Sequence, residues 1–266
     1  MGVLGVLLAR AGFEPPSVNE LYQWPCIVHF SIGGVNLCMN KVVFLELGVA
    51  AFTAFLFIYA FWKPRVVPRG AQNLMEAIYD FVARDVVEGV LGRRGVVWQP
   101  YLTVLFFFAL FVSLIEVVPA VQFPVSSRIA IPLVLAIGSW LVYNGAGIRE
   151  KGLFGYFKDV MFPPGVPWFG YILLTPIELV TALVLRPATL AIRLFANFFA
   201  GHVLLAVFFL GTAYLVANPV TIAFGVAALA LSVLLVGLEI FIAAVQAYVF
   251  TLLTAVYITL SVSHEH

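Results

Sequence analysis

Two very long apolar segments near the C-terminus constrain the fold of this chain most strongly. They cover about residues 168–216 and 219–261, with Asn218-Pro219 between them. A helix that crosses a bilayer perpendicularly needs only about 20 residues, and each segment is about twice that long. Such a segment either contains extra turns or lies strongly tilted in the membrane. Because no break interrupts the second segment after Pro219, we predict two long tilted helices that form an antiparallel hairpin at this turn.

The rest of the chain also reads as an integral membrane protein. Of its 266 residues, 63% are hydrophobic and only 10% are charged. Three shorter apolar stretches, at about 42–62, 101–118 and 129–148, are each long enough for one span. We therefore predict an all-α membrane fold with about five spans in one domain, residues 42–266, which follows an N-terminal segment, residues 1–41.

Lysine and arginine are distributed unevenly between the two sides of this arrangement. Nine of them lie on two connections of one side, and three lie on the other. Positively charged connections face the cytoplasm. The N-terminus and the hairpin turn are therefore predicted outside and the C-terminus inside. The nine are Lys63, Arg65, Arg69, Arg84, Arg93, Arg94, Arg149, Lys151 and Lys158, and the three are Arg10, Lys41 and Arg128.

One of the inner connections contains an amphipathic pattern. From Ala71 to Val90, apolar residues recur at helical spacing and charged residues fill the gaps. This pattern predicts an amphipathic helix at the inner membrane interface. It fits either an ordinary interfacial helix or a helix that docks a partner protein.

Few polar residues interrupt the long hairpin. Arg193 lies about 36 Å of helix from the break near Asn218-Pro219, at 1.5 Å per residue. An arginine keeps its charge in a protein, so Arg193 places a permanent positive charge deep in the bilayer, where such residues mark ion pathways. Arg186, Arg193 and Asn197 share one helical stripe, and Glu239 and Gln246 share a face of the last helix.

Residues at equal height in an antiparallel hairpin have numbers with a constant sum. Arg193 and Gln246 sum to 439, and His202 and Glu239 sum to 441. Both sums place the turn near Pro219, so these pairs are predicted at matching heights. On an ideal helix, however, His202 points about 180° away from Arg193, so the two pairs do not share one straight seam.

Several function classes find no support in the sequence. The chain has no P-loop, dinucleotide fingerprint, zinc-ligand cluster or nucleophile motif, and a net charge of +1 gives no reason to expect nucleic acid as a partner. We expect no cofactor, no metal ion and no catalytic chemistry within this chain. A secondary ion transporter would also carry Arg, His and Glu in its spans, but it predicts repeated halves and broken helices.

The hairpin residues carry a family resemblance. The run from Arg186-Pro187 through Arg193-Leu-Phe-Ala-Asn197 to Ala200-Gly201-His202 resembles subunit a of the F-type ATP synthase. Two later runs resemble it as well, Leu238-Glu239-Ile-Phe and the stretch from Gln246 to Thr254. The resemblance is dense over about residues 170–262 and topological over 40–160.

This resemblance implies a proton-translocating subunit beside a rotating ring of c subunits, each of which bears a carboxylate. Two offset half-channels lead to the ring from opposite sides, and Arg193 matches the arginine between them. His202 and Glu239 match the polar pair of the outer half-channel, with Glu116 near its mouth, while Glu178 resembles the acidic residue of the inner one. The expected partners are the c-ring, the peripheral-stalk subunit b, the remaining synthase subunits and the lipid bilayer. The expected location is a bacterial plasma membrane, with the mitochondrial inner membrane as the alternative.

This sequence departs from the family pattern in a few places. Nine residues separate Glu178 from Pro187, where eight are usual, and Ser113 replaces an asparagine. The segment Ser126-Ser127-Arg128 lacks the Asp or Asn of many members, so the outer mouth is less acidic. Glu46 in the first span is expected to reach the outer interface.

Ahead of the first span, residues 27–37 alternate partly and contain Gly33-Gly34. This pattern fits a β-hairpin that could bring Cys26 and Cys38 within disulfide reach.

Overall fold

The computed structural model describes residues 28–32, 35–39, 41–117, 129–162, 168–217 and 221–263. Its first elements are the predicted β-hairpin, strands β1 (Val28–Ile32) and β2 (Val35–Met39), which pair antiparallel with Val28 opposite Met39. The register places Cys38 opposite His29. Cys26 lies outside the described residues, so the disulfide stays a prediction.

The first two predicted spans are present as antiparallel helices. They are α3 (Lys41–Phe61) and α5 (Gln99–Val117). Aromatic side chains fix their alignment, because the ring centroids of Phe52 and Phe111 lie 5.3 Å apart and those of Phe57 and Phe107 lie 5.2 Å apart. Edge-to-face contacts of this kind are favourable beyond the apolar area that they bury.

The amphipathic segment between these spans is helical, with a break at Gly92, whose φ is 63° and ψ is −158°. It consists of α4 (Ala71–Phe81), a π-helical stretch (Val82–Leu91) and a 3-10 stretch (Gly92–Trp98). Its apolar face is covered by protein, since Val82, Val86 and Val87 are fully buried against residues of α5 and α9. The prediction of an amphipathic helix is confirmed, and much of its apolar face rests on the helices of the chain.

The third predicted span is longer than expected. Helix α6 (Ala130–Met161) continues through the charged residues 149–159, which we had assigned to a connection. The chain reverses at Gly152, whose φ of 74° and ψ of 163° lie in a region that is essentially restricted to glycine. The charged segment is therefore mostly helical and folds back on the span.

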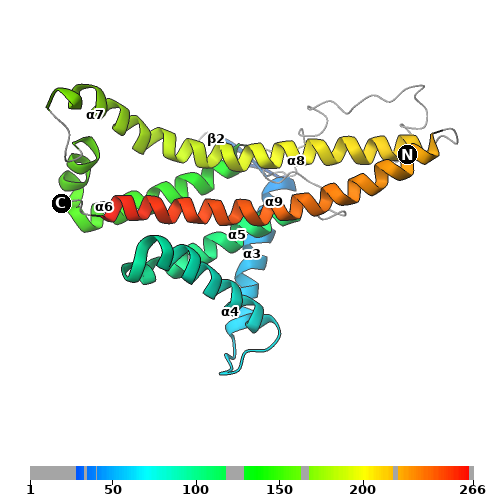
Figure 1. The fold of residues 1–266 in the computed structure, drawn as a ribbon, viewed down its shortest axis with the longest axis horizontal. Coiled ribbons are helices and arrows are strands. Elements are labelled where there is room, and N and C mark those ends of the chain that lie inside the picture. Colours follow the sequence, from blue (N-terminus) through cyan, green and yellow to red (C-terminus); the bar gives the residue numbers. More distant parts are fainter. Residues whose placement is uncertain are drawn as a thin grey trace.

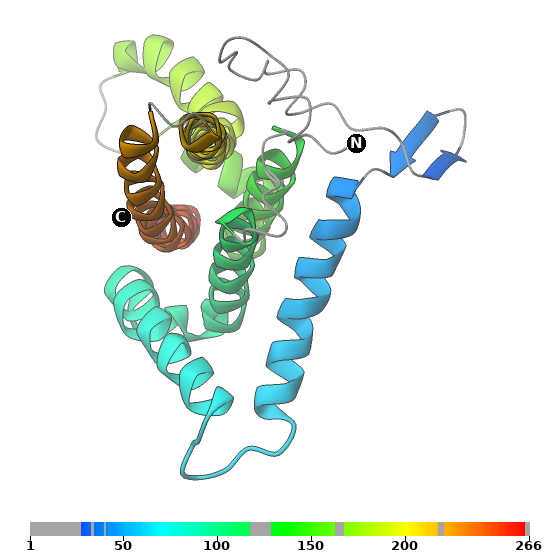
Figure 2. The same cartoon turned by 90° about the vertical axis from the view of Figure 1, so that its right-hand side faces the viewer.

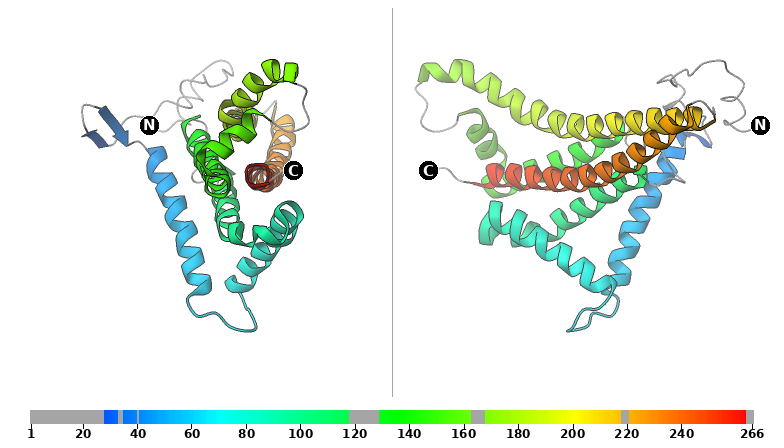
Figure 3. Two further views of the ribbon diagram at one scale, coloured as in Figure 1. Left: turned by 90° about the vertical axis from the view of Figure 1, so that its left-hand side faces the viewer. Right: turned by 45° about the vertical axis from the view of Figure 1, so that its right-hand side comes forward.

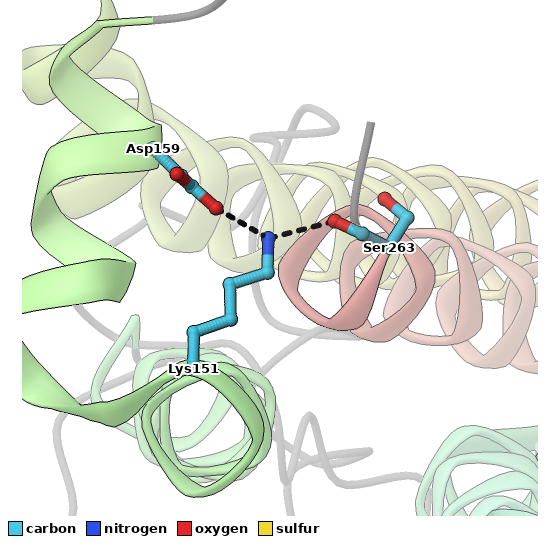
Figure 4. A network of polar contacts seen from close by, with 3 residues as sticks. All are labelled: Lys151, Asp159 and Ser263. Carbon is cyan, nitrogen blue, oxygen red and sulfur yellow. Dashed lines mark hydrogen bonds and ion pairs between the residues drawn. The ribbon is translucent and has the colours of Figure 1, made fainter. Parts of the chain in front are cut away.

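A small polar network holds this reversal in place (Figure 4). The Lys151 ammonium lies 3.0 Å from a carboxylate oxygen of Asp159 and donates a hydrogen bond of 2.7 Å to the carbonyl of Ser263. The hydroxyl of Tyr156 donates a 2.7 Å hydrogen bond to Oδ1 of Asn144. The network ties the end of α6 to the end of the last helix.

The first long apolar segment forms one nearly unbroken helical path of 47 residues, Tyr171–Ala217. After a 3-10 turn (Trp168–Gly170) it comprises α7 (Tyr171–Val180), a π-helical stretch (Thr181–Leu185) and α8 (Arg186–Ala217). Pro187 has no N–H to donate to the carbonyl of Ala182, five residues back in this π-helical stretch. The Trp140 indole and the Tyr143 hydroxyl both donate to that carbonyl, each at 3.3 Å, and so pin α6 to this position.

The second long segment is α9 (Ile222–Val262), and together α8 and α9 form the predicted antiparallel hairpin. The two helices meet at the hairpin turn and diverge toward α7 and the C-terminus, with the end of α6 between them (Figure 1). The hairpin runs across the direction of α3, as Figures 2 and 3 show. This inclination explains how helices of this length fit in a bilayer.

Within the described residues, four stretches are long and apolar enough to cross a membrane: Val43–Phe61, Gly95–Ile115, Tyr171–Ala217 and Ile222–Val262. Helix α6 is not among these four, so a fifth span stays a prediction. A buried cluster joins α5, α6, α8 and α9, and its largest members from α8 and α9 are Leu190, Leu194, Phe198 and Phe250. The buried core therefore packs against one side of the hairpin and does not cover the opposite side.

Candidate functional site

The α8/α9 hairpin has the register that the sequence predicts. A Cβ placed on Gly201 would overlap the Glu239 carboxylate, and one placed on Gly225 would lie 2.7 Å from a Val216 methyl group. Near the turn, the hydroxyl oxygens of Thr212 and Ser232 lie 3.4 Å apart. The numbers in these pairs sum to about 440, so the predicted heights are confirmed.

Arg193 lies on the outward side of α8. Its neighbours Leu190, Ala191 and Leu194 are each 1% exposed, whereas Arg193 itself is exposed. Among the described residues, none accepts a hydrogen bond from Arg193 or forms an ion pair with it. A guanidinium in an apolar belt that has no partner among the described residues is costly unless an anion pairs with it.

Arg186 provides an internal comparison, because it lies two turns earlier on the same stripe. Its guanidinium carbon lies 5.5 Å from the centre of the Tyr257 ring. This is a cation–π contact, which satisfies part of the charge within the chain. Of these two arginines, Arg193 is thus the one that is presented to the surroundings.

Asn197 and Gln246 connect the two helices one turn from Arg193. Nδ2 of Asn197 donates a 2.7 Å hydrogen bond to Oε1 of Gln246. Gln246 is 5% exposed, and its own Nε2 has no hydrogen-bond partner among the described residues. This amide is held in place with one donor still available. The sequence predicted Gln246 beside Arg193, and its bonded partner in the structure is Asn197.

Glu239 is the single acidic residue of helices α8 and α9. Both of its carboxylate oxygens are buried and have no hydrogen-bond partner in the described part of the chain. The carboxylate lies directly against Gly201, where its Cδ would be 3.2 Å from a Cβ. Only glycine at position 201 leaves space for it. A buried carboxylate with no partner is costly in its charged form, so it needs a proton or water.

A cavity of about 170 Å³ connects these groups between α5, α8 and α9. Its polar lining consists of Ser113, Asn197, Glu239 and Gln246, and apolar residues form the rest of its wall. The cavity is large enough for several waters and has the polar partners that buried water needs. It extends to Val117 at the C-terminal end of α5. Ser113, to which sequence reasoning gave no role, is therefore part of the site.

His202 lies apart from this cavity. It is 9% exposed and belongs to the buried stripe of α8 that includes Leu194 and Phe198. Because neither oxygen of Glu239 has a hydrogen-bond partner, the predicted pair of His202 and Glu239 is not hydrogen-bonded. The two residues match in height, but Glu239 lines the cavity and His202 does not.

The remaining predicted residues lie farther away. Glu178 is a half-buried residue of α7, 15 positions before Arg193 and therefore about 22 Å along the helical path. Glu116 belongs to α5, but its side chain lies outside the described residues. Glu46 in α3 is half-buried, and its Oε1 has no hydrogen-bond partner among the described residues.

Comparisons with known proteins point to one family. A family profile described as "ATP synthase A chain" matches residues 42–259. ATP synthase subunit a of Frankia alni is 45% identical over 262 residues, covering 98% of this chain and 90% of the relative. ATP synthase subunit a of Rhodococcus erythropolis is 36% identical over 263 residues, covering 97% and 94% respectively. The same subunit of Hyphomonas neptunium is 38% identical over 247 residues, covering 92% and 94%.

Proposed function

This chain belongs to the ATP synthase subunit a family and is the proton-channel subunit of an F-type ATP synthase, and from this premise we propose how its residues move protons. The observation that carries the proposal is the isolated charge of Arg193 on the outward side of α8. Its partner is a carboxylate of the rotating c-ring, which faces this side of the hairpin. The permanent charge draws that carboxylate into its ionised form, so its proton leaves there.

The cavity between α5, α8 and α9 is proposed as the inner part of the outer half-channel. Protons arrive from the end of α5, where Glu116 lies, and pass Ser113 and Glu239. The Asn197–Gln246 pair then leads to the ring, one helical turn from Arg193. Glu239 suits a relay because its carboxylate has no fixed partner and can bind and release a proton through water. His202 contributes from the adjacent side of α8 and not through a bond to Glu239.

The inner half-channel is proposed to lie beyond Arg193, along α7, with Glu178 as its acidic residue. Arg193 separates the two half-channels, because a proton that moves directly between them would have to pass a permanent positive charge. Each charge that crosses the membrane gains about 2.3 kcal/mol per 100 mV. This energy turns the ring, and the catalytic head of the complex uses the rotation to make ATP. Subunit b is the proposed stationary neighbour.

ATP-driven acidification of inverted membrane vesicles tests the proposed proton coupling. The signal is expected to be the same with and without sodium and to be lost in Glu239→Leu vesicles. Glu150→Leu, which removes an exposed carboxylate of α6 without a proposed role in the pathway, is the matched control. A signal that requires sodium, or one that Glu239→Leu leaves unchanged, would contradict the proposed pathway.

The proposed location is a bacterial plasma membrane, with the N-terminus outside and the C-terminus in the cytoplasm. The relatives reported above are bacterial, and the excess of lysine and arginine assigns the sides. Thiol labelling in a background without Cys26 and Cys38 checks this orientation. A membrane-impermeant maleimide should label Phe224→Cys in intact cells and Val66→Cys only in inverted vesicles. The original side chains at these positions are 71% and 102% exposed. The reverse labelling pattern would invert the assignment.

A further inference from the structure

The connection between α3 and α4 forms a pocket that the proton pathway does not use. Its volume is about 410 Å³, and its lining includes Tyr59, Trp62, Lys63, Arg65, Arg69 and Gln72. Three of these side chains are cations, two are aromatic and one is an amide. The pocket lies on the side of the membrane that carries the excess of lysine and arginine.

The pocket concentrates positive charge, and none of its lining residues is acidic. Lys63, Arg65 and Arg69 are all exposed, and among the described residues none of them forms an ion pair. Helix α4 begins at the pocket with Gly70 and Ala71, without a side-chain cap and without an acidic residue in its first turn. Its free N–H groups and the positive end of its dipole add to the potential. Such an arrangement favours a phosphate group.

The nearest acidic residue on α4 is hydrogen-bonded to Gln72 of the pocket lining and forms no ion pair with the three cations. Oε1 of Glu76 accepts a 2.7 Å hydrogen bond from Nε2 of Gln72. Gln72 is 7% exposed, and its side chain also binds the backbone of Arg65. The Arg65 N–H donates to Oε1 of Gln72 at 3.2 Å, and the Arg65 carbonyl accepts from Nε2 of Gln72 at 3.0 Å. This buried amide holds the backbone of Arg65 against α4, so the loop that carries the cations is anchored at the pocket.

The surroundings of the cations match the level of a lipid headgroup. Helix α3 ends at Phe61, and the adjacent Tyr59 and Trp62 are 63% and 73% exposed. Tyrosine and tryptophan are enriched where the hydrocarbon meets the headgroups. The loop then places the fully exposed Val66 between Arg65 and Arg69. Apolar and cationic groups thus alternate. A lipid can contact both kinds of group, whereas a free phosphate ion would contact only the cations.

We propose that this pocket binds the phosphate headgroup of an anionic phospholipid from the leaflet on this side. Arg65 and Arg69 hold the phosphate oxygens, since guanidinium groups can bind two of them at once. Lys63 adds a third charge, and Tyr59 and Trp62 contact the glycerol and the first part of the acyl chains. A bound lipid would fix the inner end of α3 against α4 in the assembled synthase.

A photo-crosslinking experiment on the whole synthase tests this site. The complex is reconstituted in phosphatidylcholine nanodiscs with a trace of diazirine-bearing phosphatidylglycerol, and the labelled peptides are mapped by mass spectrometry. Labelling is expected within residues 59–72. Each cation near an anionic headgroup adds to the free energy of binding. The affinity for this lipid should therefore fall on the order of a hundredfold in the triple variant Lys63→Gln/Arg65→Gln/Arg69→Gln.

Two further variants separate site loss from general effects. The triple variant Arg84→Gln/Arg149→Gln/Lys158→Gln removes the same number of exposed charges on the same side and should keep the labelling. Arg65→Lys/Arg69→Lys keeps the charges and should retain most of it, which shows that the loop still folds when both arginines are replaced.

The outcomes that overturn the proposal are distinct. Unchanged labelling in the Lys63/Arg65/Arg69 triple variant rejects the site. Displacement of the lipid by millimolar inorganic phosphate would identify the ligand as the free ion. Loss of subunit b from that triple variant, with lipid labelling retained, would make this surface a protein contact. None of these results depends on the proposed half-channels, because ATP-driven proton pumping is measured separately on the same preparations.

Discussion

Two arginines seven positions apart show how differently one helix can use the same side chain. Arg186 lies over the ring of Tyr257 and so has a partner within the chain. Arg193 is exposed, without an ion pair or hydrogen bond among the described residues. The cost of leaving such a charge unpaired in the membrane is recovered only if a partner subunit supplies the anion. The structural difference between the two residues supports a functional role for Arg193.

At the same scale, Gly201 limits the space for the Glu239 carboxylate. Gly201→Ala would force that carboxylate to move, because the new Cβ overlaps Oε1. Since a shift of about 1 Å in a reacting group can cost on the order of a hundredfold in rate, we expect ATP-driven proton pumping to fall strongly. Adding Glu239→Asp, which shortens the side chain, should restore part of the loss.

Gly211→Ala is the matched control for this prediction, because no atom lies within 4 Å of a Cβ at that position of the same helix. Vesicle acidification with equal amounts of assembled synthase compares the three variants. Equal pumping by Gly201→Ala and Gly211→Ala would show that the position of Glu239 is not important for transport.

At the scale of the elements, the heights of residues in the hairpin could be predicted, but their contacts across the hairpin could be predicted only in part. The sum of residue numbers fixes which residues are level, so contacts such as that of Gly201 with Glu239 follow from the sequence. It gives no information on the direction in which a side chain points. His202 was therefore matched to Glu239 in height, although it belongs to the buried stripe with Phe198.

The reversal in α6 was missed for a related reason. The charges of residues 149–159 resemble a solvated connection, and the sequence does not show that Lys151 reaches both Asp159 and the carbonyl of Ser263. Likewise, the sequence does not show what the missing N–H of Pro187 does to the fold. In the structure it leaves the Ala182 carbonyl to Trp140 and Tyr143, which lie far away in the sequence. Long-range hydrogen bonds of this kind need the fold before they can be recognised.

The register of the hairpin can be tested by disulfide cross-linking. Thr212→Cys with Ser232→Cys should cross-link readily, since the native hydroxyl oxygens are 3.4 Å apart. Thr212→Cys with Ala243→Cys is the control, because Ala243 lies on the same buried face of α9 but about 16 Å farther along it. Both pairs are made in a background without Cys26 and Cys38, and the products are separated on non-reducing gels. Preferential cross-linking of the control pair would reject the register and the cavity that depends on it.

At the scale of the whole molecule, the fold leaves one side of the hairpin uncovered and packs its own helices against the other. The buried clusters join the hairpin to α5, α6 and the amphipathic segment, so these elements act as a support. The polar cavity lies between this support and the hairpin and reaches the C-terminal end of α5. Arg193 is placed at the exposed side, one turn from the cavity. A stationary channel subunit beside a rotating partner requires this division into a fixed side and a contact side.

Gradient-driven ATP synthesis in membrane vesicles with Arg193 variants tests this account most directly. Arg193→Ala is predicted to abolish synthesis, because no permanent charge remains to ionise the ring carboxylate. Arg193→Lys should lose most of it, since a lysine is a point charge that can lose its proton when it is desolvated. Arg149→Ala, which removes an exposed arginine outside the hairpin, should synthesise ATP at nearly the normal rate. Near-normal synthesis by Arg193→Ala, with the complex fully assembled, would contradict the central role of this residue.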